Sequence, residues 1–358
     1  MNTLKLAEWL ERSGWTVRLL ANEQSPMYAN AVSALGHVTS VQQLSGKPKP
    51  SAGTIVKWLG DAKDNAILFT PFNKDIKPLS AFKRWHARKM KLVYQQHMKV
   101  GVKKKDIFHR LRYAMLDLWI SPLPYLKEET IRLTPVPAEK IKVIALGLDP
   151  SKFTPGGHGK NKSRELLSLP QDVRMLGVVG RIDPKKGQDF SIRCIARLKE
   201  HHSRDYHLLI MGNTTHLEGN EHFNKLKRLI TELHLEDRVH LRPYTGDVTL
   251  FYEAVDICCV PSHGETYGMV TLEAMLMKKP VVGVNTDGTR ALLQEGRLGW
   301  LHELEDLDGC CRQILAVEQE AATSGKLSAA REEVLHNYSE NELMKATEQA
   351  LQDLLQGS

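Results

Sequence analysis

The stretch DICCVPSHGETYGMVTLEAMLMKKPVVGVN (residues 256–285) decides the fold class. It opens and closes on short apolar runs, DICCVPS and PVVGVN, and a segment with helical spacing lies between them. Continuous apolar strands of this length are typical of parallel sheets buried on both faces, which need a helix to connect them. The stretch therefore predicts a strand, a loop, a helix and a second strand parallel to the first.

The same alternation continues on both sides of this stretch. Predicted strands fall at residues 174–181, 206–213 and 238–244, and predicted helices at 188–201, 220–235 and 289–295. Strands that alternate with helices predict an α/β fold with a parallel sheet covered on both faces. In such sheets ligands bind at the carboxyl ends of the strands, so the loops at those ends are the candidate sites.

The N-terminal part is less regular but has the same ingredients. We expect a helix at residues 4–14, a final amphipathic helix at 339–355, and strands at 15–22, 65–72, 90–98 and 140–149. The segment PSKFTPGGHGKNKS (150–163) is rich in Pro, Gly, Lys and Ser, as linkers are. The predicted organisation is an N-terminal domain (1–150), a linker (151–163), a C-terminal domain (164–338) and a C-terminal helix (339–358) that returns to the first domain.

Composition limits the class of protein. The 358 residues are 42% hydrophobic and 25% charged, which suits two globular domains of ordinary size. No apolar run approaches the roughly 18 residues that span a bilayer, and the first residues lack the apolar stretch of a signal peptide. We therefore expect a cytoplasmic location. The five cysteines (Cys194, Cys258, Cys259, Cys310 and Cys311) have no C-x-x-C spacing, so we expect buried small residues rather than disulfides or a zinc site.

Positive charge is concentrated in the first part of the chain. Residues 1–150 hold 24 Lys and Arg against 12 Asp and Glu, whereas the remainder holds 25 against 30. Between Lys74 and Arg112 there are 13 basic and two acidic residues, interleaved with Phe82, Trp85, Met90, Phe108 and Tyr113. The predicted patch consists of Lys83, Arg84, Trp85, Arg88, Lys89, Lys103, Lys104 and Lys105. A solvated basic face and a membrane or acceptor surface explain it about equally well; only charge favours nucleic acid, and we expect none.

The segment GVVGRIDPKKGQDF (177–190) places Gly180, Arg181 and Lys186 in a loop between a strand and a helix. A planar guanidinium, a mobile ammonium and the free N–H groups of a helix start together suit a phosphate. The alternative is a solvated surface turn.

Two carboxylates flank the helix start in residues 262–275. Glu265 lies in the loop, and Glu273 lies about one and a half turns into a helix that begins near Gly268. The first N–H groups of that helix have no internal partner and can bind an anion or sugar hydroxyls, and Glu273 can accept hydrogen bonds from a vicinal diol. The two residues can also be a helix-cap group and a surface charge. NTDGTRALL (285–293) repeats the arrangement and supplies N–H groups at Gly288 and Thr289.

Taken together, these segments resemble the retaining glycosyltransferases of family 4 (glycosyl transferases group 1), which have the GT-B fold. The matching segments are GRIDPKKG (180–187), YEAVDICCVPSHGETYGMVTLEAM (252–275) with KKPVVGVN (278–285), and KIKVIALGLDPSKFTP (140–155). The resemblance is dense from about Asp117 to Leu301. It implies two Rossmann-like parallel-sheet domains that face each other across a cleft.

The resemblance also implies roles for residues of this chain. Arg181 and Lys186, next to Gly180, would bind the donor diphosphate; Glu273 would hold the nucleotide ribose; and Glu265 would lie near the donor sugar. The remaining donor contacts would be Arg242, Pro243, Tyr267, Gly268, Met269 and Val270. His97 matches a histidine on the N-terminal side of the cleft, although a lone histidine is as often structural. The implied catalytic set is therefore Arg181, Lys186, Glu265 and His97.

The implied activity is transfer of a sugar from a UDP-, GDP- or ADP-sugar to a cell-envelope glycan or lipid-linked acceptor, as in lipopolysaccharide or polysaccharide biosynthesis. It would take place in the cytoplasm or, for a peripherally attached protein, at the inner membrane face. Fixed cations and helix starts can stabilise the leaving diphosphate, and there is no Asp-x-Asp pair, so we expect no metal or other cofactor. The alternatives are a sugar-nucleotide epimerase or phosphorylase, or a non-catalytic sugar-nucleotide binder.

The chain departs from the family pattern at its beginning. The family opens with a strand and a glycine-rich loop, whereas Met1 is followed almost at once by the first helix. We therefore expect the N-terminal sheet to lack a central strand. An upstream start, another way of closing the cleft, or reduced activity would each account for this departure.

Overall fold

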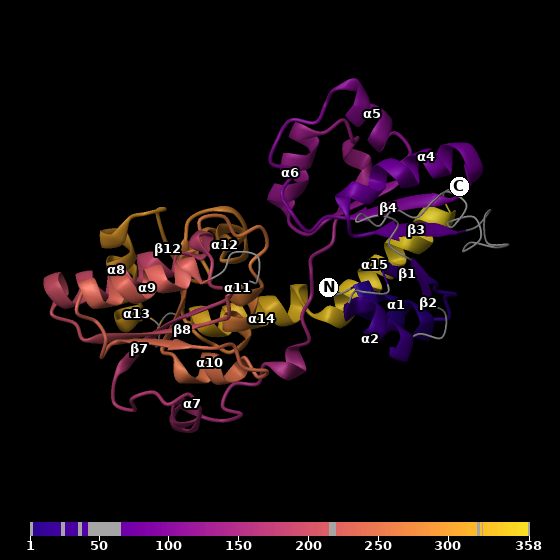
Figure 1. Ribbon diagram of the computed structural model, residues 1–358. Coiled ribbons are helices and arrows are strands. Elements are labelled where there is room, and N and C mark those ends of the chain that lie inside the picture. The colour runs from indigo at the N-terminus through magenta and orange to yellow at the C-terminus, as the bar shows by residue number, and fades with distance from the viewer. Residues whose placement is uncertain are drawn as a thin grey trace. The chain divides into compact units, whose positions relative to one another are not determined.

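The computed structural model describes residues 3–22, 26–34, 38–41, 66–214, 220–320, 323 and 325–356. The chain divides into unit 1, Met1–Gly147 with Glu340–Ser358, and unit 2, Leu148–Ser339. Each unit carries parallel β-strands with helices packed on them (Figure 1). The predicted α/β class with two parallel-sheet units is confirmed.

Unit 2 follows the predicted alternation of strands and helices. Its strands are β7 (Arg174–Val179), β8 (Tyr206–Met211), β9 (Val239–Arg242), β10 (Ile257–Val260), β11 (Val281–Val284) and β12 (Trp300–His302). Its helices are α7 (Lys160–Leu166), α8 (Gln188–His202), α9 (Glu221–Glu232), α10 (Thr249–Ala254), α11 (Met269–Leu276), α12 (Asp287–Leu292), α13 (Leu307–Glu320) and α14 (Lys326–Asn337). Short 3₁₀ turns are η4 (Pro150–Lys152), η5 (Pro184–Lys186) and η6 (Gln294–Gly296).

The sheet of unit 2 has the order β12-β11-β10-β7-β8-β9, and every pair is parallel. The chain starts in the middle at β7, adds β8 and β9 on one side, and then returns to place β10 against β7 with Ile257 opposite Leu176. The two sides of the sheet therefore diverge between β7 and β10. At such a switch point the flanking loops separate and leave room for a ligand.

Helices cover both faces of this sheet. Leu176 and Val178 of β7 point to the face where α8, α9 and α13 supply Ile192, Leu226 and Ile314. Side chains alternate along a strand, so Gly177 points to the other face, where Phe251 of α10 packs closely on it. Burial on both faces explains why the strands are continuous apolar runs.

Asp256 fixes the amino ends of the two central strands. Its Oδ2 accepts a hydrogen bond from the Met175 N–H at 2.8 Å and from Arg164 Nη2 at 3.1 Å, and its Oδ1 accepts one from Lys160 Nζ at 2.6 Å. Burial alone would raise the pKa of Asp256. The three hydrogen-bond donors outweigh this effect, so the net pKa lies below its usual value. The fully buried Arg164 also donates to the carbonyls of Ala254 and Val173.

The segment 151–163, predicted as a linker, makes specific contacts with unit 2. The Gly156 N–H donates to Glu253 Oε1 at 2.6 Å, and His158 Nε2 lies 2.8 Å from Asp247 Oδ2. Its last residues begin α7, which packs against α10. Hydrogen bonds from this largely exposed segment therefore attach it to unit 2.

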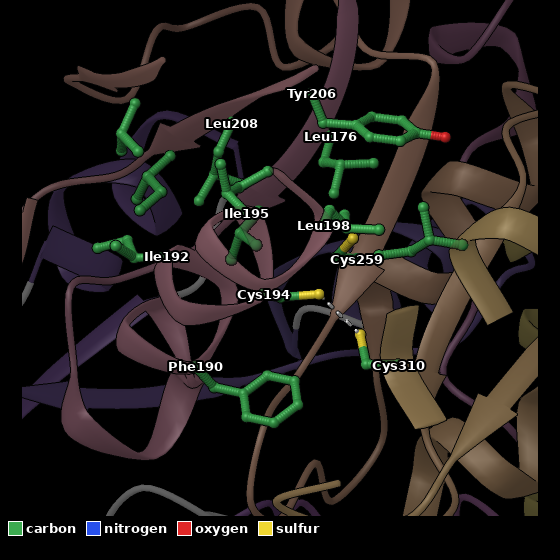
Figure 2. Packing of buried hydrophobic residues seen from close by; sticks show 14 of the residues in the cluster. Leu176, Phe190, Ile192, Cys194, Ile195, Leu198, Tyr206, Leu208, Cys259 and Cys310 are labelled. Carbon is green, nitrogen blue, oxygen red and sulfur yellow. Dashed lines mark hydrogen bonds between the residues drawn. The ribbon is translucent and has the colours of Figure 1, made fainter. Parts of the chain in front are cut away.

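All five cysteines are buried and reduced. The Sγ atom of Cys194 on α8 lies 3.6 Å from the Sγ atoms of both Cys310 and Cys311 on α13. Figure 2 shows Cys194, Cys259 and Cys310 within the same apolar cluster as Ile195 and Leu198. Burial raises the pKa of Cys258 to about 12 and that of Cys259 further. The thiols act as small apolar groups that pack helices on the sheet.

Unit 1 contains two parallel sheets in the part of the chain that the structure describes. Its strands are β1 (Leu19–Asn22), β2 (Val38–Val41), β3 (Ile67–Thr70), β4 (Lys91–Gln95), β5 (Leu118–Ser121) and β6 (Ile141–Val143). Its helices are α1 (Thr3–Arg12), α2 (Pro26–Ala34), α4 (Ile76–His86), α5 (Ile107–Tyr113), α6 (Pro124–Leu133) and α15 (Glu340–Gln356), with 3₁₀ turns η2 (Asn73–Asp75) and η3 (Ala138–Lys140).

The strands of unit 1 pair as β1-β2 and as β3-β4-β5-β6. Among the described residues, no hydrogen-bonded pairing joins β1 to β3. The four-stranded sheet is covered on one face by α4 and α5, through Phe82 and Tyr113. On the other face α1 and α15 supply Leu6 and Leu351. The absence of a central strand remains a prediction.

The last helix packs on the first within unit 1. Lys5 Nζ lies 2.9 Å from Glu340 Oε1, and the indole N–H groups of Trp9 and Trp15 both donate to Glu348 at 3.0 Å. These bonds place two segments from opposite ends of the sequence side by side.

Two stacked histidines give unit 2 a predictable pH dependence. The rings of His207 on β8 and His240 on β9 lie 5.3 Å apart, with Nδ1 of the first 3.0 Å from Nε2 of the second. Burial, and next the neighbouring His207, lower the pKa of His240 from 6.5 to about 4. As the pH falls below about 6.5, the unfolded chain binds a proton that folded His240 does not bind until about pH 4. Protonation of His240 therefore costs the folded state no stability above about pH 6.5. The free energy of unfolding falls as the pH drops from about 6.5 to about 4.

We expect His240→Gln to remove about 1–2 kcal/mol of acid destabilisation, a figure reduced from the full shift because the side chain is partly exposed. The measurement is urea unfolding of wild type and variant at neutral pH and near pH 4.5. His201→Gln, on the exposed end of α8, is the matched control. An equally steep loss of stability in wild type and His240→Gln would contradict the prediction.

Candidate active site

The candidate site in unit 2 lies where the carboxyl ends of β7 and β10 meet. The loop after β7 carries Gly180, Arg181 and Lys186, and the loop after β10 carries Glu265. Because β7 and β10 are paired and parallel, both loops leave the sheet at the same edge, at the switch point. Segments that lie about 80 residues apart in the sequence are thereby brought together.

The loop after β7 is held by its own backbone. Asp183 accepts a hydrogen bond from the Lys185 N–H at 2.8 Å and starts the turn η5. Gly187 follows with φ of 68°, and a Cβ there would lie 2.4 Å from the Pro261 carbonyl oxygen. Only glycine fits this left-handed position against the neighbouring loop. The arrangement leaves Arg181 exposed, 3.6 Å from Asp183, and directs Lys186 toward the loop after β10.

Lys186 and Glu265 form the central contact of the site. Lys186 Nζ lies 2.6 Å from Glu265 Oε2, and both side chains are partly exposed. A second bond joins the loops, from the His263 N–H to the Lys185 carbonyl at 2.9 Å. An ammonium has three N–H donors, so Lys186 can keep Glu265 and still donate to a ligand.

Helix α11 begins beside this pair. Gly268 precedes it with φ of 98°. A Cβ atom at this position would lie 3.4 Å from Cγ of Glu265, so the Glu265 side chain lies next to the helix start. The N–H groups of Met269 and Val270 fall in the first turn, where α-helices have no internal acceptors. Tyr267 is buried beneath the loop. The start of α11 therefore places helix N–H donors next to the Lys186–Glu265 pair.

Glu273 on α11 is half-buried, and one hydrogen bond to its carboxylate is seen among the described residues. The hydroxyl of Tyr252, which is itself buried, donates to Glu273 Oε2 at 2.7 Å. Burial raises the pKa of Glu273, and the bond from Tyr252 opposes this in part. Among the described residues Oε1 has no hydrogen-bond partner. One carboxylate oxygen is thus fixed by the protein, and the other remains an acceptor.

Gly288 does not supply a free N–H group, which corrects the sequence prediction. Its N–H donates to the Glu265 carbonyl at 2.8 Å. Thr289 is buried. This bond joins the loop after β11 to the loop that carries Glu265, so residues 285–293 hold that loop in place.

Arg242 and Pro243 lie at the end of β9. The Arg242 guanidinium donates at 2.6 Å to the carbonyls of both Leu167 and Ser168, so it anchors the end of α7. Pro243 is exposed. The side chain of Arg242 is therefore occupied by these carbonyls, so a donor contact at Arg242 would have to come from its backbone.

His97 belongs to unit 1 and follows β4. Burial lowers its pKa, so the neutral imidazole is favoured. Two residues earlier, at the end of β4, Gln95 is buried, and neither of its amide atoms has a hydrogen-bond partner among the described residues. Gln96, in contrast, accepts from Trp119 Nε1 and Ser121 Oγ at 3.0 Å. The carboxyl end of β4 is thus a polar region within the core of unit 1.

The predicted basic patch needs correction. Lys83 is buried, where it forms an ion pair with Asp117 and donates to the Met115 carbonyl at 3.1 Å. Phe82, Met90 and Tyr113, which the sequence pattern placed among the cations, are also buried. The other charged members and Trp85 remain: Arg84, Trp85, Arg88, Lys89 and Lys103 are exposed, whereas Lys104 and Lys105 are partly exposed.

Sequence reasoning missed Tyr252 and Asp183. The tyrosine lies 21 positions before Glu273 on another helix, so no spacing rule connects them. Asp183 had a local signal, because Asp before Pro-Lys-Lys is a usual start of a helical turn.

Across the described ranges of the chain, no three His, Cys, Asp or Glu side chains come together in a way that suits a metal ion. A cavity of about 590 Å³ opens on unit 1 beside β6 and α15, with Lys142 and Asp353 paired at its rim. It contains none of the predicted site residues.

Comparison with known families identifies similar proteins for the region that contains unit 2. Residues 159–334 match the family described as glycosyl transferases group 1, so the resemblance inferred from the motifs is confirmed for this region. Two similar sequences are D-inositol 3-phosphate glycosyltransferases. That of Stackebrandtia nassauensis is 34% identical over 168 residues, 46% of this chain and 37% of the relative. That of Kineococcus radiotolerans is 35% identical over 176 residues, 48% and 40% of the two chains. The chain thus spans less than half of each relative's length.

Solved structures extend the comparison to the fold. A glycosyltransferase from Rickettsia africae has a TM-score of 0.87 at 19% identity and covers 99% of this chain and 94% of its own. Anabaena Alr3699/HepE in complex with UDP has a TM-score of 0.82 at 20% identity, with 98% and 94% covered. The predicted GT-B fold is confirmed.

The close approach at Gly288 can be tested by substitution. A Cβ at Gly288 would lie 2.4 Å from the Tyr267 carbonyl oxygen and 2.8 Å from that of Glu265, so Gly288→Ala must displace the loop. We expect a loss of about 1–3 kcal/mol, equivalent to a melting temperature lower by about 2–10 °C for a unit of this size. Gly246→Ala is the control, because its Cβ meets nothing within 4 Å. Equal melting temperatures for the two variants would show that the loops are not packed as described.

Proposed function

We propose that this chain is a retaining glycosyltransferase that moves a sugar from a nucleotide-sugar donor to an acceptor of the cell envelope, at the cytoplasmic face of the membrane. One observation carries the proposal: Lys186 and Glu265 meet beside the start of α11, at the switch point of a parallel sheet. Cations with helix N–H groups suit a diphosphate, and carboxylates suit the hydroxyls on either side of it. The family match over residues 159–334 supports the same reading.

The proposed donor is a UDP-, GDP- or ADP-sugar. Its diphosphate would lie between Lys186, Arg181 and the first N–H groups of α11. The ribose would bind the free oxygen of Glu273, while Tyr252 holds the other oxygen. Among the similar structures, Anabaena Alr3699/HepE has been solved with UDP and with UDP-glucose, which makes a uridine donor the first to test.

The proposed chemistry rests on stabilising the leaving group. As the glycosidic bond breaks, negative charge develops on the diphosphate. Cations and N–H dipoles that already point there need no rearrangement at that moment. Lys186 is held in place by Glu265 before any ligand binds, so little side-chain freedom remains to be lost. Glu265 would then accept a hydrogen bond from the donor sugar, and we assign it no role as an acid or a covalent nucleophile.

Two acceptor classes follow from different observations. The basic, partly apolar surface of unit 1 favours a lipid-linked acceptor, as in lipopolysaccharide or polysaccharide synthesis. The names of the similar sequences favour a phosphorylated polyol such as D-inositol 3-phosphate. Transfer assays with both acceptors, read by the glycosylated product, distinguish the two. An epimerase would instead change the donor sugar, and a phosphorylase would need free phosphate.

Binding of the donor nucleotide should stabilise the folded protein. Ligands that bind only the folded state stabilise it by about 2.7 kcal/mol at a concentration one hundred times the dissociation constant. We expect one nucleotide diphosphate among UDP, GDP and ADP to raise the melting temperature by several degrees. Lys186→Ala should abolish that rise, whereas Lys162→Ala on α7 should keep it. If none of these nucleotides or their sugars changes the melting temperature of the wild-type protein, the proposed function is excluded.

The two glutamates should differ in what they control. Glu273→Gln removes a charged acceptor from the ribose position and should weaken donor binding about 10- to 150-fold, in line with about 1.5–3 kcal/mol for charged hydrogen bonds. Glu265→Gln should leave donor binding within a few fold and mainly slow transfer. Calorimetry with the donor nucleotide gives the first quantity and product formation the second. Glu295→Gln, an exposed residue near α12, is the control.

A chelator tests the expectation that no metal takes part. If Arg181, Lys186 and the α11 N–H groups carry the charge of the diphosphate, EDTA should leave the rate of nucleotide release unchanged. A loss of rate that Mg²⁺ or Mn²⁺ restores would assign that charge to a metal ion instead.

A further inference from the structure

Unit 1 exposes an unusual number of large apolar side chains in one short segment. Five of them fall between residues 98 and 111: Met98, Val102, Ile107, Phe108 and Leu111. Their exposed fractions run from 54% for Leu111 to 78% for Phe108. Single exposed apolar residues are ordinary, but a group of this size marks a contact surface.

Helix α5 arranges three of these residues as a stripe. Ile107 and Leu111 are four positions apart, and Phe108 lies three before Leu111, so all three occupy one side of the helix. The helix is well anchored on its other side. Tyr113 is buried, with its ring 5.7 Å from that of Trp119, and Ser80 of α4 donates to the Arg112 carbonyl at 2.7 Å. The apolar stripe is therefore held outward by a fixed helix.

Cations accompany the stripe. Between residues 98 and 112 the chain has six Lys or Arg and a single acidic residue, Asp106, which caps α5 through the N–H groups of Phe108 and His109. The neighbouring helix α4 ends with the exposed Arg84 and Trp85, and Arg88 and Lys89 follow it. Figure 1 shows α5 at the outer edge of unit 1 beside α4.

We propose that α5 and the preceding segment 98–106 form a membrane-contact surface that inserts Ile107, Phe108 and Leu111 into the interface of an anionic bilayer. This surface differs from the patch read off the sequence, which centred on lysines and included the buried Lys83. The proposal deepens the proposed function, because a lipid-linked acceptor would be met at this surface. Vesicle binding itself requires no donor and no transfer.

A bilayer fits this surface better than other anionic partners. An anionic lipid surface offers negative charge at the headgroups and apolar chains a few ångströms below, which matches cations around a protruding apolar stripe. Nucleic acid would use the cations and stack on Phe108, but it has no place for the aliphatic side chains of Val102, Ile107 and Leu111. No helix among the described residues is long and apolar enough to cross a bilayer.

The test is flotation of the whole chain with vesicles. The vesicles are phosphatidylcholine alone, or an equal mixture of phosphatidylcholine and phosphatidylglycerol. Wild type should float with the mixture and not with phosphatidylcholine alone. Since each buried CH₂ contributes about 0.8 kcal/mol, the triple variant Ile107→Ser, Phe108→Ser, Leu111→Ser should bind at least about tenfold more weakly. Lys103→Glu with Arg110→Glu should lose a similar factor, because each cation near the surface contributes about 1 kcal/mol.

The control is Leu166→Ser with Leu304→Ser, which removes two exposed leucines from unit 2 and should float as wild type does. All variants should keep the wild-type melting temperature, since the altered side chains are exposed. Wild type that fails to float with the mixture overturns the proposal, as does a triple variant that floats equally well. Loss only in the charge variant would indicate adsorption without insertion and would also overturn it. Flotation without sugar transfer would contradict the proposed function alone.

Discussion

The pairing of β7 with β10 is the constraint on which the candidate site depends. These strands lie about 80 residues apart in the sequence, and only their adjacency brings Lys186 to Glu265. Asp256 secures the other end of the pair by accepting hydrogen bonds from the first residues of β7 and from Arg164. A half-buried carboxylate that accepts from three donors is costly to leave unpaired. The amino ends of the strands thus supply the rigidity, and the carboxyl ends carry the exposed polar groups.

Much of this architecture could be predicted because it is local. The strands of unit 2 are short apolar runs, and the helices between them show apolar residues at helical spacing, so alternation alone predicted the parallel sheet. The loops at the carboxyl ends followed from the same pattern. The family resemblance implied that Lys186 and Glu265 contact the same donor, and the structure places the two side chains in direct contact.

What could not be predicted depends on partners far away in the sequence. Lys83 reads as one cation among many, and only the fold reveals Asp117 beside it. Segment 151–163 reads as a linker, yet Glu253 and Asp247 bind it from about 90 residues later. In each case the composition was read correctly and the missing information was a long-range hydrogen bond.

Charge counting alone favours unit 1 for an anionic ligand, whereas the proposed diphosphate site lies in unit 2. Unit 2 lies in the part of the chain with more acidic than basic residues, yet it holds the proposed diphosphate site. In the proposed site two cations on one loop and the start of one helix would hold the diphosphate, because donors fixed within a few ångströms outweigh distant charges that water and salt screen. The basic excess of unit 1 is spread over an outer surface, where many weak, screened attractions can add up against an extended anionic surface. A compact anion and an extended one thus call for different arrangements of the same residue types.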